Sequence, residues 1–236
     1  MPVLGIEFNG CHSWKDKHLT MALGKNVGRP SKIKRKRRPP FSNKEYDFSL
    51  LYGSQEYENR PLKYPFNLIG RTKEEMNVES MAIQNWLMGA VGKQPLRDDS
   101  FPGYHFLAEV EDETSFDENW SDGILMVTFD AYPFLIADDY EGNDDWDSFN
   151  FLLDFYQSVD FEISGSKTIT LYNPGITQSV PKFISDSIFS IQKDDEVISI
   201  LEGTTENNDF VLDPGENELT INGNGNLSIR FYKELI

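Results

Sequence analysis

The stretch FVLDPGENELTINGNGNLSIRFYKEL, residues 210–235, decides the fold of the C-terminal part of the chain. Apolar residues alternate with polar ones in two runs, 219–221 and 227–231, and a period of two residues is typical of a half-buried β-strand. Between the runs, residues 222–226 read Asn-Gly-Asn-Gly-Asn, and these residue types accept the positive φ of a tight turn. The pattern predicts the closing β-hairpin of a β-sandwich.

The residues before this stretch, from 159 onward, have the same character. Short alternating runs recur between turns built from Asn, Gly and Pro, which is typical of an antiparallel sandwich or a jelly roll. The acidic, turn-rich segment ADDYEGNDDWDSF (137–149) precedes them and indicates a domain boundary. We therefore predict a β-sandwich domain over 136–236 and an N-terminal domain over 1–135. The sandwich strands are predicted at 161–163, 168–172, 188–192, 197–201 and in the closing hairpin.

The N-terminal domain is predicted to be α+β, with one prominent α-helix at about 73–91. Thr72 and Glu75 have the spacing of a capping box, and Gly92 is placed to end the helix. Apolar residues recur between them at helical spacing, as expected for a helix that packs on a sheet. The whole protein is thus expected to be mainly β with one helix. The helical stripe is Met76, Ile83, Leu87 and Ala90, and the strands are predicted at 4–8, 19–23, within 46–69, at 104–111 and at 123–129.

The composition is that of a globular protein without disulfides. Of 236 residues, 39% are hydrophobic and 13% aromatic, enough for a packed core in each domain. The single cysteine, Cys11, excludes an intrachain disulfide and a multi-cysteine metal site. No apolar run reaches about 18 residues, and the N-terminus lacks the layout of a signal peptide. We expect folding in a reducing cytoplasm and no membrane insertion.

Charge is distributed unevenly along the chain, whose net charge is −17. Residues 1–100 carry 17 Lys and Arg against 11 Asp and Glu, a net of +6. Residues 101–236 carry 5 against 28, a net of −23. The acidic part would repel a phosphate backbone, which argues against DNA or an anionic membrane as its partner.

The segment GKNVGRPSKIKRKRRPPFSN, residues 24–43, is rich in Gly, Pro and cations. Such a segment does not form a helix or a central strand, so we predict an exposed arm. A nucleic-acid or nuclear-import role is one interpretation of its cations. No aromatic residue is interleaved with them to stack on bases, which favours a solvated tip or a contact with an acidic protein surface. The candidate protein-contact residues are Lys32, Lys34, Arg35, Lys36, Arg37 and Arg38.

No motif in the sequence indicates catalysis or cofactor binding, so we expect no catalytic residue, no cofactor and no enzymatic activity. Carboxylates are abundant but occur in polar clusters, whereas a glycosidase needs one kept protonated by burial. Cys11 and His12 are adjacent, and adjacent residues of a strand point to opposite faces. Glycine-rich phosphate loops are absent.

Two acidic segments are candidates for a cation site. In DENWSDG (117–123), Asp117, Asn119 and Ser121 stand at alternate positions like the ligands of a calcium loop. The glycine comes one residue late, and Thr128 stands where the loop needs a bidentate Glu. We interpret this segment as an acidic turn and assign no metal site; a weak cation site within 137–147 stays open.

Sugar-binding residues are scarce in the predicted sandwich. Sugar sites commonly combine an exposed aromatic ring with hydrogen-bonding side chains, yet beyond residue 133 the chain holds one Trp, Trp146, one Arg, Arg230, and no His. Asn173-Pro174-Gly175 has glycine where the Asn-Pro-Arg motif of galectins has arginine. The sandwich therefore lacks the ligand residues that its architecture suggests.

Taken along its whole length, the sequence resembles the distal tail protein (Dit) family of long, non-contractile-tailed phages, or siphophages, and related prophages of Gram-positive bacteria. The resemblance rests on segments in the family's order rather than on one motif. It departs from the family at PPFSNKEYDFSLLYGSQ (39–55), where many relatives have a Gly-rich segment. The segments are GIEFNGCHS (5–13), YENRPLKYPFNLIG (57–70), IQNWL (83–87), LRDDSFPGYHFLAEV (96–110), VTFDAYPF (127–134), LYNPGITQSVPKF (171–183) and LDPGENELTINGNGNLSIRFYKEL (212–235).

The resemblance implies a place in an assembly rather than an activity. Members form a ring, usually a hexamer, at the end of the tail tube, with N-terminal belt domains and an outer galectin-like β-sandwich. The ring joins the tail tube protein to the tail hub, or tail-associated lysin-type protein, with receptor-binding or baseplate proteins as further partners. DNA passes only transiently through its lumen. The expected location is the virion tail tip, after assembly in the host cytoplasm.

A carbohydrate-binding function is the alternative to this structural role. A galectin-like carbohydrate-binding module, fused to a helper domain, would contact host cell-wall saccharide. A wall hydrolase is the least favoured reading, because the chain shows no nucleophile or metal set.

Overall fold

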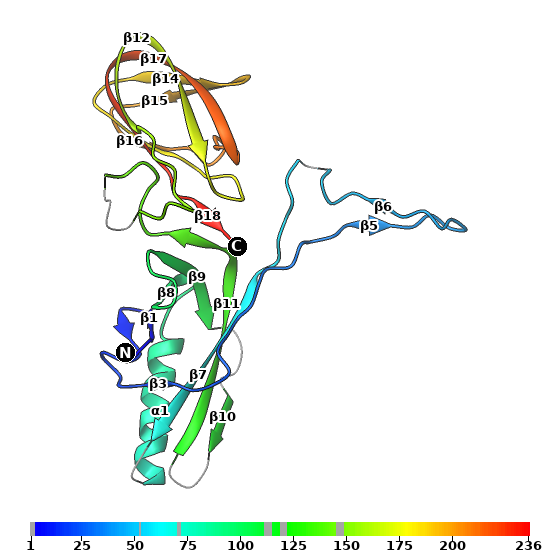
Figure 1. Ribbon diagram of the computed structural model, residues 1–236, viewed down its shortest axis with the longest axis vertical. Coiled ribbons are helices and arrows are strands. Elements are labelled where there is room, and N and C mark those ends of the chain that lie inside the picture. The colour runs from blue at the N-terminus through cyan, green and yellow to red at the C-terminus, as the bar shows by residue number, and fades with distance from the viewer. Residues whose placement is uncertain (1–2, 52, 70–71, 111–114, 119–121, 145–148) are drawn as a thin grey trace. The chain divides into compact units, whose positions relative to one another are not determined.

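The computed structural model describes residues 3–51, 53–69, 72–110, 115–118, 122–144 and 149–236. The chain forms two compact units: residues 1–135 together with Ile236, and residues 136–235. Both are built mainly from antiparallel strands, and α1 is the one helix of the described residues (Figure 1). The predicted class, mainly β with one prominent helix, is confirmed.

The first unit is an antiparallel sheet in the order β2-β1-β8-β9-β11-β7-β3, with β4 on β7 and β10 on β11. Its longest pairing joins β7 and β11, in register from Arg60 opposite Ala131 to Ile69 opposite Asp122. Its strands are β1 (Ile6–Phe8), β2 (Cys11–His12), β3 (Thr20–Met21), β4 (Asn26–Val27), β7 (Arg60–Ile69), β8 (Gln94–Asp98), β9 (Tyr104–Val110), β10 (Ser115–Glu118) and β11 (Asp122–Ala137).

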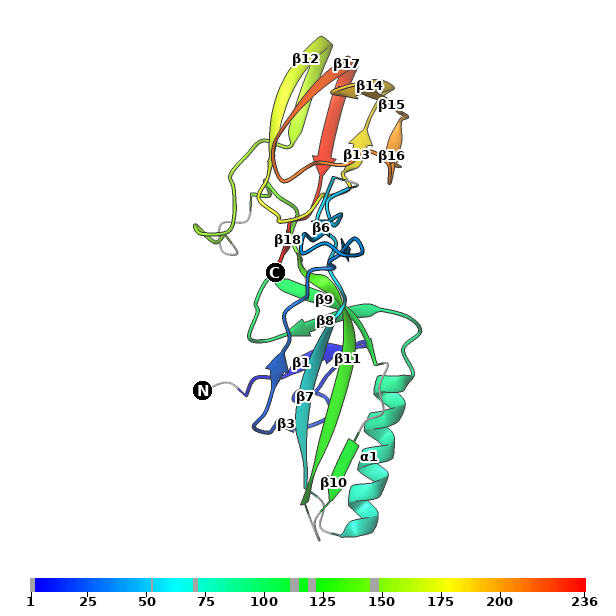
Figure 2. The ribbon, with the colours of Figure 1, turned by 90° about the vertical axis from the view of Figure 1, so that its right-hand side faces the viewer.

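Helix α1 (Lys73–Met88) begins at the predicted cap, since the Thr72 hydroxyl accepts a hydrogen bond from the backbone N–H of Glu75 at 3.2 Å. Its apolar stripe packs on the sheet (Figure 2), and Met76, Ile83 and Leu87 are buried. The predicted end was wrong. The helix ends at Gly89, whose N–H donates to the Asn85 carbonyl, and Gly92 takes its positive φ beyond the helix. No helix in the described part of the chain has the length and apolar character needed to cross a bilayer.

The second unit wraps its strands around a separate core, which includes Leu171, Phe183, Ile191 and Phe210. The sheet order is β15-β14-β17-β13-β16, with β12 also paired to β17. The predicted strands 161–163 and 168–172 are one continuous strand, β12. The strands are β12 (Asp160–Asn173), β13 (Lys182–Ser185), β14 (Phe189–Lys193), β15 (Glu196–Ile200), β16 (Gly203–Glu206), β17 (Gly215–Arg230) and β18 (Glu234–Leu235).

The predicted hairpin at 222–226 is wrong, because β17 continues through these residues without reversing. Gly223 and Gly225 have φ of 151° and 132°, values that bend an extended strand without reversing it. A Cβ on Gly223 would lie 2.5 Å from the Phe189 ring, and one on Gly225 would lie 2.2 Å from an Asp186 carboxylate oxygen. Around this bend β17 changes partner, from β14 before it to β13 after it. The glycines therefore allow close approach of neighbouring strands rather than a turn.

Candidate protein-contact site on the arm

The arm is the excursion of the chain between β4 and β7, residues 28–59, and it is longer than the predicted 24–43. Residues 24–27 belong to its root, because β4 pairs with β7. Residues 46–59, predicted within the strand region 46–69, belong to the returning half of the arm, which lies back along the outgoing half. β5 (Lys36–Arg37) pairs there with β6 (Tyr46–Asp47), and Lys32 forms a bridge with Tyr57 (Figure 1).

All six candidate contact cations lie on the outgoing half and are exposed. Three of them meet carboxylates of the returning half: Lys34 Nζ lies 3.5 Å from Asp47, Arg35 Nη2 2.6 Å from Glu56, and Lys36 Nζ 3.0 Å from Glu45. The hydrogen bond and charge of Glu45 raise the pKa of Lys36. Exposed ion pairs of this kind contribute little to the free energy of folding. They orient the two halves of the arm relative to each other but add little to the stability of their pairing.

The other three cations, Lys32, Arg37 and Arg38, have no hydrogen-bonded or ion-paired side-chain partner among the described residues. Over residues 28–59 the chain carries eight Lys and Arg against four Asp and Glu, a net of +4. The remaining residues carry 14 against 35, a net of −21. The arm is therefore the basic element of an otherwise acidic protein, and Lys32, Arg37 and Arg38 are available to an outside partner.

Large apolar side chains are exposed on the arm, and none belongs to either hydrophobic core. The rings of Tyr46 and Phe48 stack at 6.5 Å between centroids. Tyr46 stands opposite Arg37 across the strand pair. No aromatic residue is interleaved with the cations along the outgoing half, but the returning half places one beside them. A surface combining cations with exposed rings suits a partner that is both acidic and apolar. The exposed apolar residues of the arm are Phe41, Tyr46, Phe48, Leu50 and Leu51.

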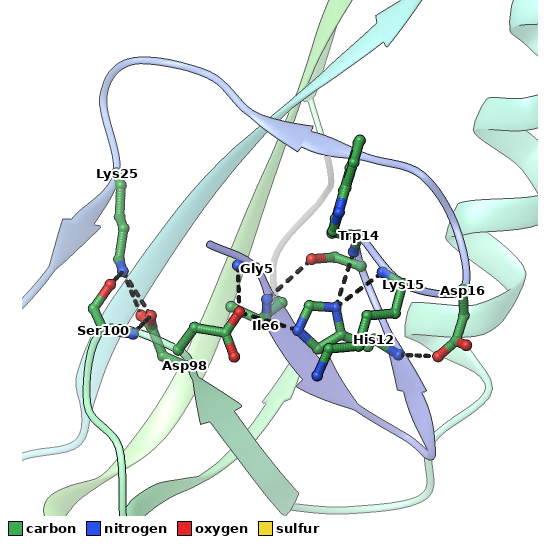
Figure 3. A network of polar contacts seen from close by, with 11 residues as sticks. Gly5, Ile6, His12, Trp14, Lys15, Asp16, Lys25, Asp98 and Ser100 are labelled. Carbon is green, nitrogen blue, oxygen red and sulfur yellow. Dashed lines mark hydrogen bonds and ion pairs between the residues drawn. The ribbon is translucent and has the colours of Figure 1, made fainter. Parts of the chain in front are cut away.

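Hydrogen bonds attach the root of the arm, but not its middle, to the first unit. The Gly28 N–H donates to the Pro61 carbonyl at 3.1 Å, and the Asn59 amide donates to Asp130 at 2.6 Å. Lys25, just before β4, places its ammonium on both oxygens of the buried Asp98, at 2.7 and 2.6 Å (Figure 3). The two ends of the arm are thus fixed while its middle offers its side chains to solvent.

Asp98 is the centre of a buried polar network that no sequence pattern predicts. Its carboxylate also accepts hydrogen bonds from the Tyr64 hydroxyl at 2.8 Å and from the Ser100 N–H at 2.9 Å. Burial, and then the Asp98 charge, raise the pKa of Tyr64, so this hydroxyl remains a donor. Every oxygen of Asp98 is used, which is what allows a carboxylate to be buried.

Replacing Asp98 with alanine should lower the free energy of unfolding of the first unit by roughly 3 kcal/mol, because Lys25 and the buried Tyr64 hydroxyl lose their acceptor. Urea denaturation followed by Trp fluorescence measures this loss. Asp99→Ala is the matched control. That carboxylate is one-third exposed, so its loss should cost about 1 kcal/mol. Equal losses in the two variants would contradict the central place of Asp98.

His12 lies in the adjoining part of this network. Its Nδ1 accepts hydrogen bonds from the N–H groups of Trp14 and Lys15, both at 3.1 Å, and its Nε2 lies 3.1 Å from Asp99 (Figure 3). Two backbone donors on Nδ1 place the proton on Nε2, where it is donated to Asp99. A Cβ on Gly5 would lie 2.6 Å from the His12 ring. Both ring nitrogens are therefore occupied in holding the N-terminal turn together.

Arg60 ends the YENR segment in an unusual environment. Its side chain is buried, its Nε has no hydrogen-bond partner, and its guanidinium carbon lies 4.5 Å from the centre of the Phe106 ring. Desolvation lowers the pKa of Arg60 to about 10. Its neighbour Asn59 is the residue that anchors the arm to Asp130, so this segment joins the arm to the core of the first unit.

The other residues weighed as ligands do not form a site where the structure describes them. No group of three or more His, Cys, Asp or Glu that could hold a metal occurs in the described ranges. Asn173 is buried and donates to the carbonyls of Thr177 and Leu212. Arg230 donates to Asp160 at 2.8 Å and stacks on Tyr140 at 4.2 Å. Trp146, Asn119, Ser121 and part of the 137–147 segment lie outside the described residues.

Comparisons by sequence gave no match: no protein-family model and no curated protein matches this chain. Comparison by structure found similar proteins. The crystal structure of the SPP1 Dit protein (gp 19.1), described as a paradigm of the hub adsorption apparatus in phages that infect Gram-positive bacteria, superposes with a TM-score of 0.68 at 11% identity, over 100% of both chains. A chain of the phage P2 baseplate in its activated conformation with Ca aligns over 98% of this chain and 97% of its own, at a TM-score of 0.46 and 9% identity. The first of these carries the fold assignment.

Proposed function

Because this chain has the fold of SPP1 Dit over its whole length, we propose that it is a structural adaptor of a phage tail tip or baseplate. In this proposal several copies form a ring, which is hexameric and leaves a central passage for DNA. The ring connects the tail tube to the tail hub and the receptor-binding apparatus. The protein has no catalytic role and works in the virion, after assembly in the host cytoplasm.

The arm is the observation in this chain that supports an assembly role. An excursion of 32 residues without a hydrophobic core of its own gains little by folding in an isolated monomer. Exposed apolar side chains beside unpaired cations are stabilised when a neighbour covers them. An adaptor in a ring has neighbours on several sides, so such a segment is useful there. The arm is proposed to contact an adjacent protein of the tail.

The second unit is proposed to be a galectin-like sandwich with a structural task. Asn173 and Arg230, the residues nearest to a sugar-binding set, both have partners inside the unit. Binding a saccharide through the buried Asn173 would require its internal hydrogen bonds to break, which leaves buried polar groups unsatisfied. Contact with other tail proteins needs no such exchange.

The mass of the purified protein in solution, together with negative-stain images of the same sample, tests the ring. We expect a closed assembly of about six copies with a central hole. If the protein alone is a monomer, the same measurement is repeated with the tail tube and hub proteins of its phage. A monomer under both conditions would contradict the proposal. Binding of host wall saccharide by that monomer would then support the carbohydrate-binding alternative.

A further inference from the structure

The segment just before β12, residues 149–156, exposes apolar side chains in the second unit. Phe151 and Leu152 are 85% and 92% exposed, and Leu153, Phe155 and Tyr156 are exposed as well. The Phe149 and Phe151 rings pack edge to face at 5.2 Å. Two large side chains side by side at such exposure are unfavourable in water unless another surface covers them. We call residues 149–156 the apolar turn.

Hydrogen bonds and an ion pair fix the backbone of the apolar turn. The Asn150 carbonyl accepts the N–H groups of Leu153 and Asp154, at 3.0 and 2.8 Å, and the Asp154 carboxylate accepts the Asn150 N–H at 2.6 Å. The Asn150 side chain accepts the Leu152 N–H at 3.0 Å. Lys233, itself buried, forms an ion pair with Asp154. The exposed side chains are therefore presented by a fixed backbone, which reduces the entropy lost on binding.

The exposed charges described beside the apolar turn are acidic. Within residues 137–156, Asp139 and Asp144 are exposed, whereas Glu141 and Asp154 pair with the buried Lys233. We call Asp139 and Asp144 the acidic rim. A partner for this region must therefore offer apolar side chains together with cations, because a carboxylate-rich or neutral apolar surface would leave the acidic rim unmatched.

The arm has that combination, with five exposed apolar side chains, a net charge of +4, and Lys32, Arg37 and Arg38 free of internal partners. We propose that the arm of one copy docks on the apolar turn of a second copy of this chain. The apolar side chains are then buried against each other, and Arg37 and Arg38 meet the acidic rim. This inference rests on the proposed function and names the neighbour that the arm contacts.

A contact between two different surfaces of identical chains has a direction. Each copy gives its arm to one neighbour and receives an arm from another, so the contact repeats until the ring closes. Both surfaces are needed in every copy. A variant that lacks the apolar turn can still give its arm, and a variant that lacks the arm can still receive one.

Photo-crosslinking from the apolar turn tests the contact. Phe151 is replaced by p-benzoylphenylalanine, which keeps an aromatic ring there, and this unlabelled protein is mixed with wild-type protein labelled uniformly with ¹⁵N. After irradiation we expect crosslinks to labelled peptides from residues 38–60. Crosslinks that join Phe151 only to arm peptides of its own, unlabelled chain would overturn the proposal, as would labelled crosslinks to other segments only, or none at the highest soluble concentration. The same probe at the exposed Leu23 is the control, and should give no arm crosslink.

Mixing of two variants provides the second measurement. Phe151→Ser with Leu152→Ser changes two exposed residues, so folding is retained, and self-association should weaken roughly tenfold or more. Arg37→Glu with Arg38→Glu should do the same alone. Equimolar mixtures of the two variants should form dimers, from one intact arm and one intact turn, but no larger assemblies. Unchanged self-association of both variants would refute the contact. A ring that forms without it would leave the proposed function standing, whereas a monomer even with the tail proteins would contradict both.

Discussion

Replacing Lys233 with methionine is expected to lower the free energy of unfolding of the second unit by about 3–5 kcal/mol. The Lys233 ammonium is buried and lies 2.9 Å from the Glu141 carboxylate, which is buried too, and it also pairs with Asp154. Methionine fills similar space but leaves two carboxylates facing each other without a counter-charge. Urea denaturation of the two proteins measures the difference, and a loss below about 1 kcal/mol would contradict this reading.

The loss should depend on pH in a definite direction. Burial raises the pKa of Glu141, against the opposing effect of Lys233. A carboxyl whose pKa is higher in the folded state contributes most below its unfolded pKa, and that contribution disappears as pH rises through the folded pKa. Without Lys233 the pKa of Glu141 rises further, so the variant should lose less at acidic pH than at neutral pH. Glu141→Gln is the control, because Lys233 keeps Asp154 and the loss at neutral pH should be smaller.

Reversing the charge of Arg37 and Arg38 should prevent tail assembly while the isolated protein stays folded. Both side chains are exposed and have no partner among the described residues, so Arg37→Glu with Arg38→Glu changes the surface offered to a neighbour and little inside the chain. Infectious titre and tail morphology measure the effect, and we expect a loss of about 100-fold or more, as for the removal of charged contacts central to an interface. Circular dichroism and the urea midpoint should be unchanged.

The choice of these two residues follows from the ion pairs of the arm. The sequence alone suggests reversing Lys34, Arg35, Lys36 and Arg37 together, which would also set new carboxylates beside Asp47, Glu56 and Glu45 and separate the two halves of the arm. The matched control is Lys63→Glu with Lys182→Glu, an equal change of charge at exposed positions off the arm. Normal titre from the arm variant, or an equal loss from the control, would contradict a contact through the arm.

Local signals predicted part of this fold correctly. The start of α1 depends on the Thr72 cap and on the apolar stripe, both of which lie within a few residues of sequence. Its end did not follow from Gly92, because the helix already ends at Gly89, three residues before Gly92. Asn9 and Gly10 also have residue types that accept positive φ, and both adopt it in the turn between β1 and β2. Where neighbouring residues alone determine the backbone, the sequence was sufficient.

Long-range contacts account for what the sequence could not show. Asn and Gly at 222–226 are compatible with a turn and with a bend in a strand. The choice depends on Phe189 of β14 and on Asp186 in the connection between β13 and β14. Tyr46, Phe48 and Leu50 alternate like core residues but stand exposed on the arm. Asp98 reaches Lys25 and Tyr64 across distances of 73 and 34 residues in the chain. On the arm, the exposure of the cations was predicted, and their acidic partners on the returning half were not.

The unbroken course of β17 through residues 222–226 also bears on the chemical ageing of the protein. Asn-Gly steps are the sites where asparagine most readily deamidates, because the following backbone nitrogen can swing round to attack the side-chain amide. Asn222-Gly223 and Asn224-Gly225 lie in a strand paired along its length with β12, and an extended, hydrogen-bonded backbone holds that nitrogen away from the amide. A hairpin at the same place would have exposed both steps to this reaction. Both asparagines should therefore last longer in the strand than they would in a turn.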